Sequence, residues 1–216
     1  FSFVDNQYRE DAQLGGLVNV AYSFDSTQKI SLKTMYNQSG EDLFVNRSGV
    51  DYANQQNIKA TSMQYTGTSL LSGQLNGTHK LLKSRLELSW GGSYSKLKRT
   101  VPNLRRMYYV QNLGDTVFQA YVPPGAPSPN YAGKYYGALN ENNYGVDVNL
   151  ALPYNIGKWN QKIHGGFSSQ IRDRDFNSRV FGYVIARTST FDWTRLLDGQ
   201  DSIFDESAIG TDGFRL

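Results

Sequence analysis

The sequence predicts an all-β fold, an antiparallel sheet that forms part of a transmembrane β-barrel. Three pairs of strand-like runs alternate apolar and polar residues with a period of two, which places one set of side chains on each face of a sheet. The connection inside each pair is short, whereas the connections between pairs are long, as in outer-membrane barrels. The 216 residues contain no run of about 18 apolar residues, so no membrane-spanning helix is predicted.

The first pair of runs surrounds a predicted turn at residues 25–28. On one face the two runs place mainly apolar or aromatic side chains: Val18, Val20, Tyr22, Phe24, Ile30, Leu32, Thr34 and Tyr36. The residues between them, such as Asn19, Ser31 and Lys33, are polar. This alternation predicts a sheet with one apolar face and one polar face.

The second and third pairs follow the same rule around predicted turns at residues 76–83 and 153–161. Their apolar faces carry Met63, Tyr65, Leu71, Leu75, Leu86, Leu88, Trp90, Tyr94, Tyr144, Val146, Val148, Leu150, Leu152, Ile163, Phe167 and Ile171. We expect Pro153 to end its strand, because proline donates no hydrogen bond to the ladder. Six strands result, or seven to eight if residues 179–187 contribute. Because bacterial barrels begin at about eight strands, we expect part of a larger wall.

The runs at residues 86–94 and 144–152 have the right length to cross a bilayer. Nine residues tilted by about 40° cover about 22 Å, close to an apolar band of about 25 Å. The side chains predicted to face lipid are Val18, Val20, Ile30, Leu32, Leu86, Leu88, Val146, Val148 and Leu150. Those predicted to face the lumen are Lys33, Glu87, Asp147 and Asn149.

Aromatic residues are expected at both membrane interfaces, where a ring lies in lipid and a hydroxyl lies among headgroups. Near the outer ends of the apolar runs are Tyr36, Tyr65, Tyr94 and Tyr144, and near the inner ends are Tyr22, Phe24 and Tyr154. The alternative interpretation is that tyrosine simply favours strands. Because four tyrosines are predicted at matching depth, two aromatic girdles are the favoured interpretation.

A soluble β-sandwich is the alternative all-β architecture, because its strands also alternate. We expect the connections at residues 38–60 and 99–141 to be long loops on the extracellular side. Loops of that length are uncommon inside compact domains, so the barrel is favoured over the sandwich.

Composition argues against several kinds of chemistry. The absence of cysteine excludes disulfides and thiolate metal sites, and His79 and His164 lack metal-ligand spacing. The net charge of +3 is too small to indicate a nucleic-acid partner. Asp173 and Asp175 share a strand face, but flanking arginines indicate a charge ladder rather than an acid–base pair. No phosphate loop or nucleophile motif is present, so we predict no enzyme, catalytic residue, metal or cofactor.

Five segments resemble barrel segments of TonB-dependent receptors from Bacteroidetes-type bacteria: residues 36–42, 65–75, 104–109, 172–176 and 209–216. The resemblance implies a barrel of about 22 strands around an N-terminal plug, in the outer membrane of a Gram-negative bacterium. Residues 1–216 would form part of that single outer-membrane β-barrel domain, without the plug. The implied partners are outer-membrane lipid, the plug of a longer parent chain, TonB and a surface lipoprotein that acts as a lid.

Ligand binding is expected in the predicted loop at residues 99–141, because loops on a rigid scaffold commonly carry function. The candidate ligand-binding residues are Arg105, Arg106, Tyr108, Tyr109, Tyr121, Tyr131, Tyr135 and Tyr136. The alternative is that these rings pack the loop against its neighbours or cover the barrel mouth. A second loop is predicted to hold a short helix that Thr190 caps, with Trp193, Leu196 and Leu197 on one side and Gly199 as its end.

Two functions follow from these expectations. The first is TonB-dependent active transport of a nutrient (a glycan, a peptide or a metal chelate) across the outer membrane. The second is a barrel that does not transport and serves as an anchoring or assembly platform for surface proteins. Aromatic and arginine side chains suit all three kinds of nutrient, so the sequence does not name the ligand.

Overall fold

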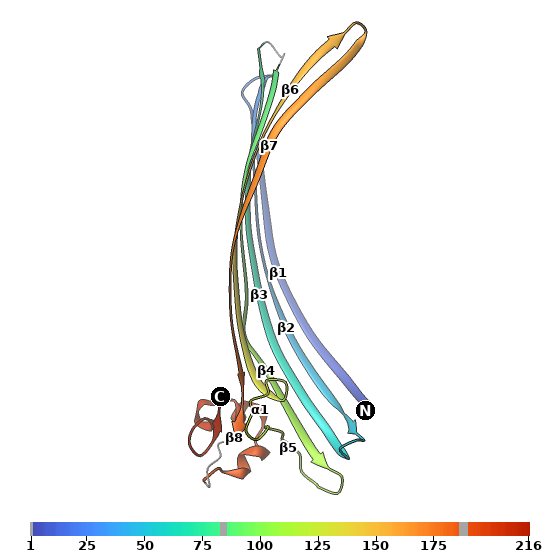
Figure 1. Ribbon diagram of the computed structural model, residues 1–216, viewed down its shortest axis with the longest axis vertical. Coiled ribbons are helices and arrows are strands. Elements are labelled where there is room, and N and C mark those ends of the chain that lie inside the picture. Colours follow the sequence, from blue (N-terminus) through green and yellow to red (C-terminus); the bar gives the residue numbers. More distant parts are fainter. Residues whose placement is uncertain (1, 83–85, 186–189) are drawn as a thin grey trace.

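The computed structural model describes residues 2–82, 86–185 and 190–216, and long strands dominate it (Figure 1). The long strands are β1 (Ser2–Ser23), β2 (Gln28–Asp51), β3 (Gln56–Leu81), β4 (Leu86–Asn112), β6 (Ala132–Ile156) and β7 (Trp159–Gly182). The short elements are β5 (Gln119–Ala120), β8 (Val184–Ile185), the 3-10 helix η1 (Trp193–Leu197), α1 (Gln200–Ile203), the 3-10 helix η2 (Glu206–Ala208) and β9 (Phe214–Arg215). The predicted all-β class is confirmed.

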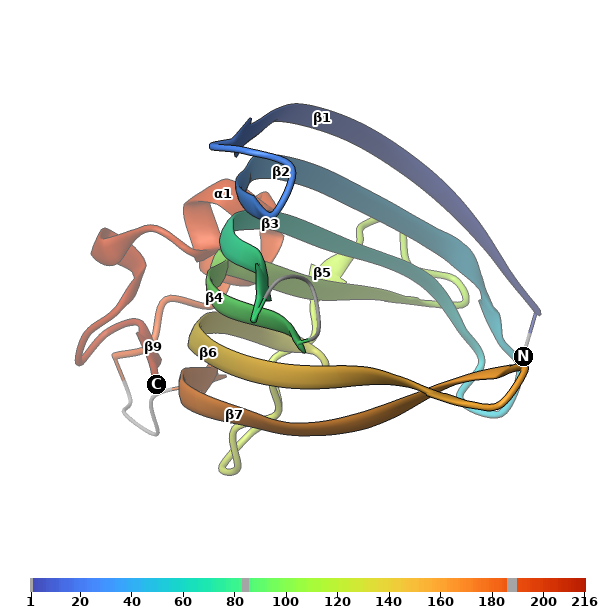
Figure 2. The same cartoon turned by 90° about the horizontal axis from the view of Figure 1, so that it is seen from above.

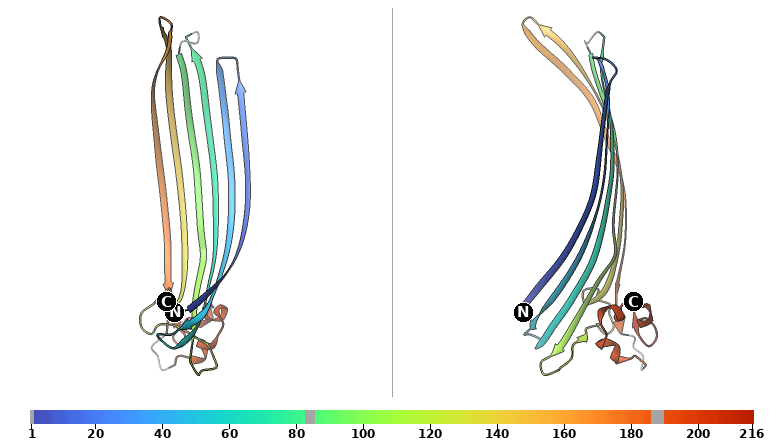
Figure 3. Two further views of the ribbon diagram at one scale, coloured as in Figure 1. Left: turned by 90° about the vertical axis from the view of Figure 1, so that its right-hand side faces the viewer. Right: turned by 180° about the vertical axis from the view of Figure 1, so that it is seen from behind.

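The long strands form an antiparallel meander in the order β1-β2-β3-β4-β6-β7, with β5 beside β4. The β1–β2, β3–β4 and β6–β7 connections therefore lie at one end of the sheet, as predicted (Figure 3). The first has the predicted length but begins one residue earlier, at residues 24–27, and the last is tighter than predicted, at residues 157–158. The predicted turn at residues 76–83 is wrong for most of its length, because β3 continues to Leu81; residue 83 lies outside the described residues.

Pro153 does not end its strand, which corrects the prediction. β6 continues to Ile156, and Pro153 pairs with Lys162 of β7. Within the described residues, the ladder between β4 and β6 ends at Ala151, and Pro153 pairs with β7 alone. A proline is tolerated at a strand position where a second ladder does not need its missing N–H.

Two predicted loops are wrong, because the strands are longer than the apolar runs. Residues 52–55 alone join β2 to β3, where the predicted loop spans residues 38–60. The predicted loop at residues 99–141 shrinks to residues 113–131, which include β5. The strands extend because the antiparallel ladder between β2 and β3 continues to the last residue of β2. Main-chain hydrogen bonds sustain a ladder without apolar side chains.

The register brings the predicted apolar side chains onto one continuous face of the sheet. Two rows across paired strands are Val20–Leu32–Leu75–Gly92 and Gly77–Trp90–Val148–Phe167. The four residues predicted to face a lumen, Lys33, Glu87, Asp147 and Asn149, share the opposite face. The predicted division of these side chains between two faces is confirmed.

The apolar face is the convex side of a curved sheet. The C-terminal segment (residues 190–216) packs farther along the same face, against Met107 and Ala132. Met107 belongs to this face because β4 has one extra residue between Val101 and Leu104, and Ala132 is its partner on β6. Figures 1 and 2 show the C-terminal segment on the outside of the curve. The polar side chains therefore line the concave side.

Three of the four outer tyrosines lie at a common level. Tyr94 pairs with Tyr144, and their ring centroids are 5.1 Å apart. Tyr36 pairs with Leu71, whose partner on β4 is two positions beyond Tyr94. Tyr65 instead pairs with Asp42, about 20 Å farther along the strand at ~3.3 Å per residue. Its predicted place in the same ring is therefore wrong.

Glycine permits one close approach inside the apolar face. The Trp90 ring lies over Gly77, where an added Cβ would be 2.3 Å from the indole. The indole Nε1 donates a hydrogen bond to His79 Nε2 at 3.1 Å. Gly73 lies on the same strand face, and nothing is within 4 Å of an added Cβ there.

The C-terminal segment forms a small hydrophobic core on the sheet. The buried residues of this core that belong to the segment are Phe191, Leu196, Ile203, Phe204, Ala208 and Phe214. The other buried residues of the core are Met107, Ala120, Val122, Ala132 and Tyr183. The predicted helix exists as η1, but Asp192 caps it and the Thr190 hydroxyl donates to Asp212. Of its predicted apolar side only Leu196 is buried. Gly199 precedes α1 as its N-cap residue.

The sheet stays open in the described part of the chain. β1 pairs only with β2, and β7 pairs only with β6, so each has one unpaired edge. Residues 179–182 prolong β7, and residues 184–185 form β8, which pairs with β9 in a separate sheet. Residues 186 and 187 of the predicted extra strand lie outside the described residues. Among the described helices, none is long and apolar enough to span a membrane.

Candidate functional site

The predicted ligand-binding residues divide between the two faces of the sheet. Most of them lie on strands rather than on a loop, and neighbours in sequence point to opposite sides of a strand. Arg106 and Tyr108 of β4 belong to the concave face, as does Tyr135 of β6. Their sequence neighbours Arg105, Tyr109 and Tyr136 belong to the convex face. Tyr121 and Tyr131 lie on the connection between β4 and β6.

The convex subset is engaged with the C-terminal segment or with β7. Arg105 lies 3.6 Å from Asp201, and the Tyr109 hydroxyl donates to the Asp198 carbonyl oxygen at 3.1 Å. Burial, with Asp198 and Asp201 nearby, raises the pKa of Tyr109 to about 12. The Tyr136 ring packs edge-on against Phe181, with centroids 5.9 Å apart. These groups therefore hold the molecule together at this end.

Lys134 strengthens the same attachment. Its Nζ donates to the Phe204 carbonyl oxygen at 2.9 Å and lies 5.3 Å from the centre of the Phe204 ring. Burial, followed by the positive charge of Arg105, lowers the pKa of Lys134. This half-buried ammonium group, with one carbonyl partner and an aromatic face, ties β6 to the C-terminal segment.

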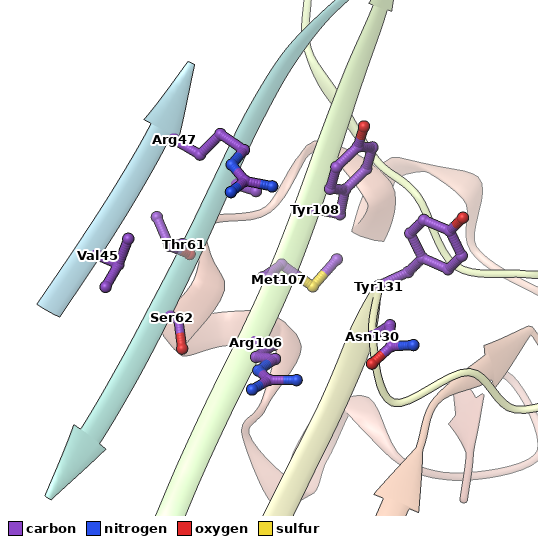
Figure 4. Close-up of a pocket in the computed structure, with 10 residues that line it drawn as sticks. Val45, Arg47, Thr61, Ser62, Arg106, Met107, Tyr108, Asn130 and Tyr131 are labelled. Carbon is purple, nitrogen blue, oxygen red and sulfur yellow. The ribbon is translucent and has the colours of Figure 1, made fainter. Parts of the chain in front are cut away.

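Arg106 and Tyr108 of the concave subset line a pocket of about 420 Å³ together with Tyr131, whereas Tyr135 does not line it (Figure 4). Its lining residues are Val45, Arg47, Ala60, Thr61, Ser62, Arg106, Met107, Tyr108, Asn130 and Tyr131. The register explains the hollow: Ser62 lies between Val45 and Arg106, and Ala60 lies between Arg47 and Tyr108. Two small side chains on β3 thus form the floor, and longer side chains on β2 and β4 form the walls. We call this hollow the concave pocket.

Tyr108 and Tyr131 line one side of the concave pocket, and the Tyr121 ring packs against both of them. Tyr108, Tyr121 and Tyr131 contact one another edge to face, with centroids 4.9–6.3 Å apart. The Tyr121 N–H donates to the Tyr108 carbonyl oxygen at 2.7 Å, which fixes the connection on β4. Tyr121 and Tyr131 each remain 39% exposed. This tyrosine cluster presents ring surface and hydroxyl groups to the concave side.

The two arginines of the concave pocket differ in their partners. Arg47 makes two hydrogen bonds to the Asp5 carboxylate, at 2.7 and 2.8 Å, and these lower the pKa of Asp5. Within the described residues, no ion pair and no side-chain hydrogen bond involves the exposed Arg106 guanidinium. No carboxylate lines the pocket. In the described part of the chain, the pocket therefore holds Arg106 without an acidic partner, beside Arg47, whose charge Asp5 neutralises.

Asp51 is an acidic residue whose charge acts on Tyr108 of the tyrosine cluster. It accepts hydrogen bonds from the Ala53 N–H and from both nitrogens of Asn54, so it caps the turn between β2 and β3. Burial, followed by the negative charge of Asp51, raises the pKa of Tyr108. The Tyr108 hydroxyl, like any tyrosine hydroxyl, is protonated at neutral pH and is available as a hydrogen-bond donor.

Sequence reasoning missed one wall of the pocket. Val45, Arg47 and Ala60 lie on strand extensions within residues 38–60, which were predicted to be a loop. The usable signal was the run from Leu43 to Arg47, where every second residue belongs to the same face. The sequence does not predict that this run lies near Arg106, because β3 stands between β2 and β4 and Ser62 pairs with both Val45 and Arg106.

No family model matches the chain, and no curated protein matches it. Among the described residues no group of three or more histidine or acidic side chains is placed to hold a metal ion. Function is therefore inferred from the geometry of the chain itself.

Proposed function

We propose that this chain forms part of the wall of an outer-membrane β-barrel that imports a nutrient in a TonB-dependent manner. The observation that carries the proposal is the division of the sheet into an apolar convex face and a polar concave face. A soluble sandwich buries its apolar face between two sheets, whereas here Val20, Val148 and Phe167 are exposed on the convex side. Lipid is the environment that suits such a face.

The open edges support a larger closed sheet. β1 and β7 expose unpaired main-chain groups over 22 and 24 residues. A long, open edge is a site of aggregation in water and is not tolerated in lipid. Further strands of a parent barrel, of the roughly 22 that the resemblance implies, would pair with both edges.

The position of the concave pocket supports import over a purely anchoring role. Arg106 lies about 40 Å beyond Tyr94 along β4, at ~3.3 Å per residue. In a barrel whose short turns face the periplasm, the pocket would line the lumen above the outer leaflet, where an entering ligand meets it first. The partners in this proposal are lipid, a plug, TonB and a lipoprotein lid.

The membrane part of the proposal is tested with single cysteines, because the chain contains no native cysteine. The full-length protein would carry Val148→Cys or, as the matched control on the other face, Asn149→Cys. Each is labelled with bimane and reconstituted in vesicles that contain brominated phosphatidylcholine. We expect strong quenching at position 148 and weak quenching at position 149. Equal quenching at both positions would contradict a lipid-facing convex side.

The transport part is tested in the producing bacterium. Loss of the full-length protein and loss of TonB should each abolish growth on the same nutrient at low concentration. If the protein is instead a platform for surface proteins, cells that lack it should lose those proteins from their surface and should still grow on the nutrient. That second outcome would replace import by the anchoring function.

A further inference from the structure

The concave pocket combines groups that suit a particular ligand chemistry. Besides the free Arg106 guanidinium, it presents the hydroxyls of Tyr108, Tyr131 and Ser62 and the Asn130 amide, and Tyr121 packs against the two lining tyrosines. Within the described residues none of these neutral groups has a side-chain hydrogen-bond partner. Four neutral polar groups beside aromatic rings favour a hydroxyl-rich ligand, whose rings stack on the tyrosines and whose hydroxyls bond to these groups.

The charges of the pocket favour a negative group on that ligand. Arg47 is neutralised by Asp5, whereas Arg106 has no acidic partner and stands beside Ser62. A planar guanidinium binds a carboxylate or sulfate through two parallel hydrogen bonds, which are stronger than neutral ones. Because no carboxylate lines the pocket, nothing within it competes with the ligand for Arg106.

We propose that the concave pocket selects acidic sugars, with Arg106 binding the carboxylate or sulfate and the tyrosine cluster holding the sugar ring. This inference rests on the proposed import function and narrows its nutrient to one chemical class. Arg106 is a specificity residue, and Tyr108, Tyr121 and Tyr131 supply contacts that do not depend on charge.

The test measures binding by isothermal titration to the purified full-length protein in detergent. Two matched pairs of probes differ mainly in charge: tetragalacturonate with its methyl ester, and sulfated cellotetraose with cellotetraose. We expect each acidic probe to bind at least about tenfold more tightly than its neutral partner, since hydrogen bonds to charged groups are roughly twice as strong. Equal affinity within both pairs, or binding of neither acidic probe, would overturn the inference.

Arg106→Gln should weaken binding of the acidic probes by about 10- to 100-fold and leave the neutral probes almost unchanged. Arg105→Gln is the matched control, because this neighbouring arginine lies on the convex face and its partner Asp201 is exposed. We expect it to change neither affinity. Equal loss in both variants would indicate a structural effect and would overturn the specific role of Arg106. Heat-modifiable gel migration checks that both variants fold.

Two further results distinguish a failure of the acidic-sugar inference from a failure of the proposed import function. Preference for tetraglutamate over both acidic sugars would overturn the sugar assignment in favour of an acidic peptide. Acidic-sugar binding that depends on Arg106, in a protein whose loss leaves TonB-dependent growth intact, would support the pocket and refute import. Binding to purified protein needs no TonB, so the two failures are distinguishable.

Discussion

Arginine at position 148 is the sharpest test of which face meets lipid. Val148 lies in the middle of the run at residues 144–152, between Trp90 of β4 and Phe167 of β7. Both neighbours in its row are aromatic, so an arginine there finds no polar partner on its own face. Asn149 is the matched position, because it lies one residue along on the concave face, between Ser89 and Gly166.

The magnitude follows from the depth of Val148. Arginine at a bilayer midplane costs about 2–4 kcal/mol in a β-barrel. Tyr144 marks the outer end of the band, about 13 Å away along the strand at ~3.3 Å per residue. An arginine side chain at position 148 is too short to bring its guanidinium to the level of Tyr144, so snorkelling recovers little of this free-energy cost. A loss of 2–4 kcal/mol corresponds to about a 30- to 700-fold smaller folding equilibrium constant. Asn149→Arg should change it by about 0.5 kcal/mol or less.

The assay is reversible folding of the full-length protein into dilaurylphosphatidylcholine vesicles across a urea gradient. Tryptophan fluorescence reports the transition, and heat-modifiable gel migration confirms insertion. We expect Val148→Arg to shift the midpoint to lower urea and Asn149→Arg to follow the parent curve. Equal shifts in both variants, or a larger shift for Asn149→Arg, would refute the assignment of the convex face to lipid.

Three more outcomes test the site and the packing. Asp5→Asn releases Arg47, so titration calorimetry should show several-fold tighter binding of tetragalacturonate, and unchanged affinity would contradict the charge argument. Because the pKa of Tyr109 is raised to about 12 from the usual value of about 10, its stabilising contribution is complete below pH ~10 and is lost as the pH rises through ~12. Tyrosinate absorbance should show this late titration, and Tyr109→Phe should reduce its amplitude by one group, because burial also raises the pKa of Tyr183 to about 12. Gly77→Ala should destabilise the folded protein by about 1–3 kcal/mol through a clash with the indole beside it, whereas Gly73→Ala should be nearly neutral, both measured by urea unfolding.

The two faces of the sheet were predictable because a strand has a fixed period of two. Wherever apolar residues alternate with polar ones, as around Val148 and Asn149, the pattern assigns each side chain to one face of the sheet. The side of the turns followed from the same reasoning, since hairpins join sequential neighbours. Local chemistry was enough for these features.

Strand ends were not predictable, because a ladder needs main-chain partners and not apolar side chains. β2 continues past Tyr36 through Glu41 and Asp42, residues that read as a loop by composition. Its pairing with β3 is a long-range property, and so is the meeting of Arg47 with Tyr108 across Ala60. The concave pocket depends on three strands in register, which no single segment of sequence contains.

The convex face changes its environment along its length, and this explains why the predicted binding residues divide. Near the short turns it carries exposed apolar side chains, whereas near the other end the C-terminal segment covers Met107 and Ala132. Arg105 and Tyr109 belong to that covered end, so their polar groups contact Asp201 and Asp198 rather than open space. The concave face has no such cover at Arg106. One strand, β4, therefore supplies a structural anchor and a candidate binding site at alternate residues, so substitutions one position apart on β4 separate attachment of the C-terminal segment from recognition of ligand.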